Sequence, residues 1–78
     1  MLISRHARSR MKLYKITSED ILLAIREPEL SDQEGENRIA VRQFDDKYGG
    51  YPLKVVYRAD TLMVVTVYPL KRKNWSRP

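Results

Sequence analysis

Residues 53–70, LKVVYRADTLMVVTVYPL, decide the fold, because they hold two apolar runs separated by a short connection at residues 59–60. Val, Tyr and Thr are enriched in strands, where branched and aromatic side chains pack well on a pleated surface. Two such runs joined by a short turn predict neighbouring antiparallel strands. The second run, residues 61–70, is the most apolar and β-branched segment of the chain, so we expect it to be the best-buried strand.

Upstream of these runs, the pattern predicts one more strand and one loop. Ile39, Val41 and Phe44 alternate approximately with Arg, Ala and Gln, which predicts a strand that ends before the turn-forming DDKYGGYP at residues 45–52. Residues 28–37, PELSDQEGEN, are acidic and contain Pro and Gly without a sustained apolar period. They predict a surface loop.

The N-terminal part of the chain predicts an amphipathic helix. Ile3, Ala7, Met11 and Tyr14 recur at spacings of four, four and three, which places them on one stripe of a helix. We place this helix at residues 4–14.

A second short helix is predicted directly after the first. Thr17 is expected to cap its N-terminus, with Asp20 three residues later as in a capping box. Pro28 disfavours helical geometry at the residue before it. The helix is therefore expected to run from near Ser18 to Glu27.

Together these elements predict an α+β fold. Two N-terminal helices pack on one face of a three- to four-stranded antiparallel β-meander. A single domain is expected over residues 1–70, and residues 71–78, KRKNWSRP, form a basic C-terminal tail.

Charge is distributed unevenly along the 78 residues, whose net charge is +5. Residues 1–26 hold six Lys or Arg and two acidic residues, residues 27–51 hold three and seven, and residues 52–78 hold six and one. We expect the two basic segments to share a face that attracts a polyanion, either nucleic acid or an acidic protein. The alternative is a charge that serves only solubility.

Several classes of site are excluded by the residues present. The chain has no cysteine and one histidine, so disulfides and thiolate sites are excluded and a catalytic metal is not expected. Gly49-Gly50 is better explained as a turn than as a phosphate-binding loop. We expect no cofactor, no membrane segment and a cytoplasmic location.

His6 and Arg10 are the candidate catalytic pair. On a helical wheel they lie one turn apart beside the apolar stripe, so both side chains are expected to approach the sheet. The 2′-hydroxyl of RNA is an internal nucleophile, so a protein need only transfer protons and stabilise the phosphate. His6 would transfer the proton and Arg10 would bind the phosphate. The alternative is a structural His6 that donates to a backbone carbonyl.

Other basic and aromatic residues are candidates for RNA binding. Cations would attract phosphates, and aromatic rings would stack on bases. These candidates are Arg42, Lys54, Arg58, Tyr68, Lys71, Arg72, Lys73 and Trp75. For the residues of the tail, the alternative is a solvated terminus.

Four segments carry a family resemblance: HARSRM at 6–11, ITSEDI at 16–21, LKVVYR at 53–58 and VVTVYP at 64–69. They resemble a family of small prokaryotic proteins described only as a domain of unknown function, with a His-x-x-x-Arg-Met motif in the first helix. That family is in turn distantly similar to the RelE and BrnT toxins of the barnase–colicin–RelE-like fold, which often cleave RNA and pair with an antitoxin.

The resemblance implies a small toxin-like, metal-independent endoribonuclease with an acidic antitoxin as its partner. It adds weight to His6 and Arg10 in the first helix, and to Thr66 and Tyr68 in the last strand. Two other readings stay open: a non-catalytic module that binds RNA or a protein, and a small subunit that forms a homodimer.

Overall fold

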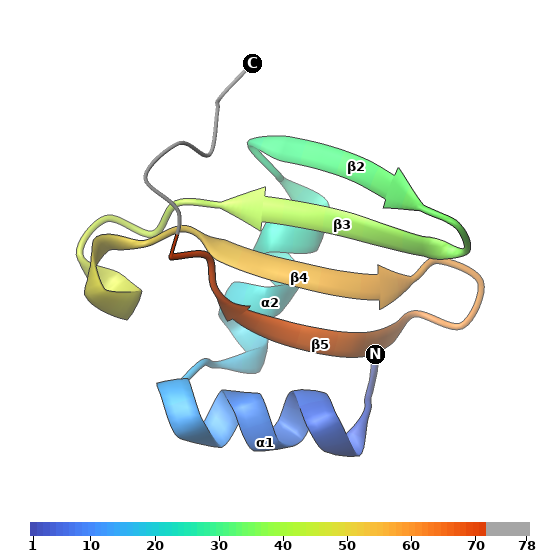
Figure 1. Ribbon diagram of the computed structural model, residues 1–78, viewed down its shortest axis with the longest axis horizontal. Coiled ribbons are helices and arrows are strands. Elements are labelled where there is room, and N and C mark those ends of the chain that lie inside the picture. The colour runs from blue at the N-terminus through green and yellow to red at the C-terminus, as the bar shows by residue number, and fades with distance from the viewer. Residues whose placement is uncertain (72–78) are drawn as a thin grey trace.

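A computed structural model describes residues 1–71 and shows two helices and a five-stranded sheet (Figure 1). The elements follow one another as β1 (Leu2–Ile3), α1 (Arg5–Tyr14), α2 (Ser18–Arg26), β2 (Leu30–Glu34), β3 (Asn37–Arg42), the 3₁₀ segment η1 (Lys47–Gly50), β4 (Leu53–Arg58) and β5 (Met63–Pro69). The strand order is β1-β5-β4-β3-β2. The predicted α+β class is confirmed. Within residues 1–71, no helix is long and apolar enough to cross a membrane.

Both predicted helices are confirmed. Each begins directly after a residue whose side chain caps the first turn. The hydroxyl of Ser4 accepts a hydrogen bond from the backbone N–H of Ala7 at 3.0 Å and starts α1. Thr17 accepts from the N–H of Asp20 at 3.2 Å and starts α2. Such caps satisfy backbone donors that have no partner inside the helix. The second helix ends at Arg26, one residue earlier than predicted.

The prediction of a loop over residues 28–37 is wrong, because this segment contains β2. It pairs antiparallel with β3 from Leu30 opposite Val41 to Glu34 opposite Asn37. Gly35 has φ +61°, which suits the tight turn between the two strands. All of β2 except its first residue is exposed, so this edge strand has no apolar alternation by which a sequence could reveal it.

The sheet is mixed, whereas an antiparallel meander was predicted. The additional strand β1 runs parallel to β5, with backbone hydrogen bonds from Leu2 to Leu62 at 3.1 Å and from Ser4 to Val64 at 3.0 Å. Two residues are too few to show a periodicity of two. The predicted three to four strands therefore become five.

Both helices lie on the same face of the sheet, with α1 along β5 and α2 behind β3 and β4 (Figure 1). Leu53 and Val55 on β4 and Val64 and Val67 on β5 are fully buried. They pack with Ala7, Ile16, Ile21 and Ala24 from the helical part of the chain. Residues that alternate with them, such as Lys54, point to the opposite face of the sheet.

Candidate nucleic-acid interface

Helix α1 and the residue after it carry a set of cations with no acidic neighbour in sequence. The first 18 residues contain no Asp or Glu, and their five cations are Arg5, Arg8, Arg10, Lys12 and Lys15. All except the half-buried Arg10 are exposed. The ion pairs within residues 1–71 involve none of the five. The surface of α1 therefore has a positive potential that no described carboxylate neutralises at close range.

His6 lies on the exposed part of α1, one turn from Arg10. Within the described part of the chain, neither side chain makes a hydrogen bond or an ion pair. The carbonyl-bound His6 of the alternative reading is thus not seen in residues 1–71. On the apolar face of α1, Ala7 is buried and Met11 and Tyr14 lie against the core, as predicted. Ile3 was predicted on the same helical stripe but lies in β1, because α1 begins only at Arg5.

Acidic side chains gather at the opposite edge of the sheet. Asp32 and Glu34 lie on β2 and Glu36 lies in the turn after it, whereas α1 runs beside β5 near the other edge (Figure 1). The predicted separation of acidic and basic segments thus corresponds to two edges of one sheet.

Two basic residues from the C-terminal third of the described chain lie in different places. Lys71 lies at the end of α1, with Nζ 6.0 Å from the ring centre of Tyr14. Lys54 points away from the helices, and its Nζ lies 5.6 Å from the ring centre of Tyr68 on the neighbouring strand. The expectation of one shared basic face therefore holds for Lys71 and not for Lys54.

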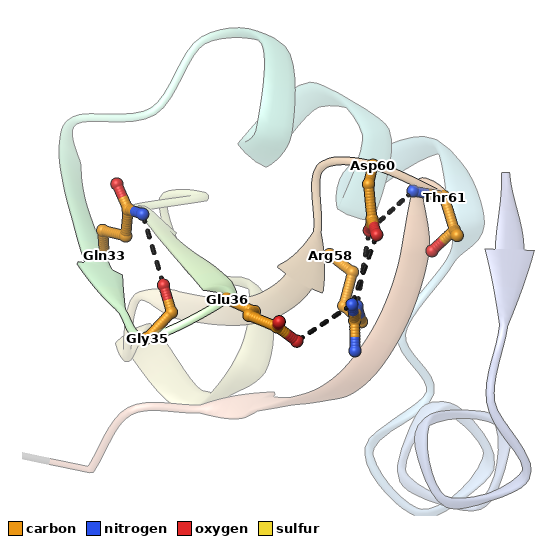
Figure 2. A network of polar contacts seen from close by, with 6 residues as sticks. All are labelled: Gln33, Gly35, Glu36, Arg58, Asp60 and Thr61. Carbon is orange, nitrogen blue, oxygen red and sulfur yellow. Dashed lines mark hydrogen bonds and ion pairs between the residues drawn. The ribbon is translucent and has the colours of Figure 1, made fainter.

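Arg58 is already paired with two carboxylates. Its Nη2 lies 3.0 Å from Glu36 and 3.2 Å from Asp60, and Figure 2 shows the guanidinium between the two. The hydrogen bond from Arg58 lowers the pKa of Asp60, and the same contact raises the pKa of Arg58. A phosphate would have to compete with both acids at this position.

Arg42 joins β3 to the C-terminal end of α2. Its Nη1 donates to the backbone carbonyl of Glu27 at 2.6 Å, at the end of α2, and its guanidinium lies 5.7 Å from the ring centre of Phe44. Arg72, Lys73 and Trp75, which were also predicted to bind RNA, lie outside the described residues. Among residues 1–71, the structure thus does not bring Arg42, Lys54 and Arg58 into one site with His6 and Arg10.

Two open grooves lie at the C-terminal end of α1 and share Tyr14 and Tyr48 as walls. The first has a volume of about 360 Å³ and is lined by Tyr14, Lys15, Thr17, Lys47 and Tyr48. The second has a volume of about 280 Å³ and is lined by Tyr14, Tyr48, Gly49, Tyr51, Pro69 and Lys71. We call the two together the tyrosine groove. It combines three tyrosines with three lysines.

A buried carboxylate holds one wall of the tyrosine groove. Asp20 on α2 is 9% exposed and accepts a hydrogen bond from the hydroxyl of Tyr48 at 2.6 Å and from Nζ of Lys47 at 3.2 Å. Burial, followed by the hydrogen bond to Asp20, raises the pKa of Tyr48 to about 12. The hydroxyl therefore stays protonated and donates to the carboxylate at neutral pH.

Sequence reasoning missed this contact. Asp20 was noted only as a helix-capping residue, and Tyr48 only as part of a turn. The two are 28 positions apart, so no local spacing joins them. The only sequence signal is an acidic residue on the apolar side of α2, next to the buried Ile21 and one turn before the buried Ala24.

Within residues 1–71, no three His, Cys, Asp or Glu side chains are grouped so that they could hold a metal ion. A family model described as "Domain of unknown function (DUF4258)" matches residues 3–69. The chain belongs to this family. No curated protein and no solved structure matches the chain. For this DUF4258 chain, membership of a family of unknown function is as predicted from the sequence, and the similarity to RelE and BrnT toxins stays a prediction.

Proposed function

We propose that this DUF4258 chain binds single-stranded RNA, with α1 along the phosphate backbone. The observation that carries the proposal is the set of five cations in residues 5–15, which no ion pair within residues 1–71 engages. Phosphates release counterions when Lys and Arg neutralise them, and this release drives binding to nucleic acids. The aromatic side chains at the end of the same helix favour RNA over an acidic protein, because bases stack on rings.

The proposal predicts how steeply the affinity for RNA falls with salt concentration. If the five cations each neutralise one phosphate, the plot of log affinity against log salt has a slope of about −3.5, from about −0.7 per phosphate on a single strand. Each cation removed should make that slope less steep by about 0.7.

The experiment measures the affinity for a fluorescent 12-residue oligouridylate by anisotropy between 50 and 300 mM NaCl. We compare Arg8→Gln and Lys12→Gln on α1 with Arg38→Gln, an exposed cation on β3 near the acidic edge. We expect weaker binding and a shallower slope for the two α1 variants only. A slope near zero for the wild type, or an equal effect of Arg38→Gln, would contradict the proposal.

A second candidate function is metal-independent RNA cleavage. The observation that favours it is the exposed imidazole of His6, one turn from Arg10 on the cationic helix. His6 would move the proton of the 2′-hydroxyl, and Arg10 would stabilise the phosphate.

Cleavage is tested with a labelled mixed-sequence RNA in EDTA, with and without ribosomes. His6→Ala should lower the rate by about 10²- to 10⁴-fold, the usual contribution of a general acid or base, while Ser9→Ala on the same exposed surface should not. If the wild type binds this RNA without cutting it, cleavage is refuted and the binding function stands. An acidic antitoxin stays a prediction of the resemblance. A homodimer stays a separate prediction, which ultracentrifugation of the purified chain tests.

A further inference from the structure

We infer that the tyrosine groove is a subsite for an unstacked base of the RNA strand, with its lysines on the flanking phosphates. This inference rests on the proposed function. The groove lies at the C-terminal end of α1, a helix of ten residues, which extends about 15 Å. An RNA strand that runs along the cations of α1 toward the C-terminal end of the helix therefore meets the groove directly after Lys12.

The walls of the groove are aromatic and are held in place. The hydroxyl of Tyr48 is bonded to the buried Asp20, and its ring meets Phe44 edge to face, with centres 6.1 Å apart and planes at 86°. Tyr14 packs partly against the core. Rings that are already fixed lose little conformational entropy when a ligand binds.

The backbone at the groove adopts a conformation that residues with a Cβ rarely take. Lys15 has φ +57° and Tyr48 has φ +58°, and both line the same part of the groove. Lys15 is the C-cap of α1, where a left-handed residue ends the helix and its N–H donates to the carbonyl of Met11. At Tyr48 this conformation is unfavourable and persists because the surrounding structure enforces it. The contacts of Asp20 with Lys47 and Tyr48 hold Tyr48 in this conformation.

The charges suit an anion beside the ring. Lys47 is paired with Asp20, but within residues 1–71 neither Lys15 nor Lys71 has an ion-pair partner. Nζ of Lys71 lies over the ring of Tyr14, so a base that stacks on this ring would displace the ammonium toward a neighbouring phosphate. A ligand with both an aromatic face and negative charge uses all of these features, and a nucleotide in a single strand is such a ligand.

An acidic peptide or an RNA duplex would use the groove less completely. A peptide of Asp and Glu would meet the lysines and leave the rings without a partner. In a duplex the bases are stacked and paired, so they are not free to enter a groove on the protein surface. The inference therefore predicts a preference for single strands that carry bases.

The test uses three probes of equal length: a 12-residue oligouridylate, an abasic ribose-phosphate oligomer, and the oligouridylate annealed to its complement. One stacked base contributes about 1–3 kcal/mol, so the wild type should bind oligouridylate about 5- to 150-fold more tightly than the abasic oligomer. Tyr14→Leu should bring this ratio close to one. Tyr14→Phe, the matched control, keeps the ring and should keep the ratio.

The outcomes separate the inference from the proposed function. If both oligomers bind the wild type equally well, or if Tyr14→Leu keeps the full ratio, the base subsite is overturned and RNA binding stands. If neither oligomer binds, both are overturned.

A second measurement needs no variant that alters the core. Oligouridylate containing 4-thiouridine is photo-crosslinked to the wild type, and the linked peptides are sequenced. Crosslinks at residues 14–17 or 47–51 support the subsite. Crosslinks confined to β2 and β3 would refute it.

Discussion

Tyr48→Phe tests the contact that holds η1 against α2. The substitution removes only the hydroxyl that donates to Asp20 at 2.6 Å, and the ring remains in the groove. Lys47 still lies 3.2 Å from the same carboxylate, so Asp20 keeps one partner. A hydrogen bond to a charged group contributes about 1.5–3 kcal/mol, and we expect the free energy of unfolding to fall by this amount at pH 7.

The raised pKa of Tyr48 also predicts a pH dependence. Its pKa rises from 10.0 to about 12 in the folded protein, first through burial and then through Asp20. This shift stabilises the folded protein while the hydroxyl is protonated. Because the folded pKa is the higher one, this stabilisation is fully present below pH 10 and is lost as the pH rises through about 12.

The assay is urea unfolding followed by far-ultraviolet circular dichroism, for the wild type and Tyr48→Phe between pH 7 and pH 11.5. In thermal unfolding followed by the same signal, the melting temperature should fall by about 6–24 °C at pH 7, given about 4–8 °C per kcal/mol in a domain of this size. The two proteins should become more alike above pH 10, because only the wild type can ionise at this position. A difference under about 0.5 kcal/mol at pH 7, the range of ordinary surface changes, would refute the reasoning. So would a difference that stays constant to pH 11.5.

Further predictions concern the helix cap, the core and the sheet edge. Thr17→Ala should lower the free energy of unfolding by about 1 kcal/mol, because the N–H of Asp20 loses its cap; Thr17→Ser should restore most of it. Leu53→Ala should lower it by about 2–5 kcal/mol, since the side chain is fully buried; urea unfolding measures both. Replacing Asp32 and Glu34 by Val should promote self-association, because charges on an edge strand oppose pairing with another copy. Sedimentation velocity at several concentrations would detect it, and an unchanged monomer would show that these charges do not protect the edge.

The elements that sequence reasoning placed well depend on local interactions. The stripe from Ala7 to Tyr14 and the caps at Ser4 and Thr17 involve neighbours within four residues. The strands over residues 53–58 and 63–69 each bury one face, so their apolar pattern is visible. By contrast, β2 is exposed almost throughout and depends on backbone pairing with β3, and backbone pairing leaves little trace in residue type.

The candidate site was less predictable than the fold, because its parts come from distant positions. The cationic character of α1 follows directly from residues 5–15. The tyrosine groove does not, since it brings Tyr14 of α1 next to Tyr48 of η1. Likewise, the pairing of Arg58 with Glu36 depends on the register of β3 and β4, and no sequence pattern indicated that this cation is already matched by acids.

The short parallel strand β1 has a consequence for the order in which the chain folds. The antiparallel pairs among β2, β3, β4 and β5 join segments that follow one another, whereas β1 pairs with β5 across 61 positions, as in the contact of Ser4 with Val65. Closing a loop of that length costs about 4 kcal/mol of chain entropy, compared with less than 1 kcal/mol for a two-residue turn. Two residues of pairing contribute little against this, so β1 and α1 should dock after the four-stranded hairpin array has formed. In the native protein, the amides of Leu2 and Ser4 should then exchange with solvent through local opening, faster than those at the centre of β4.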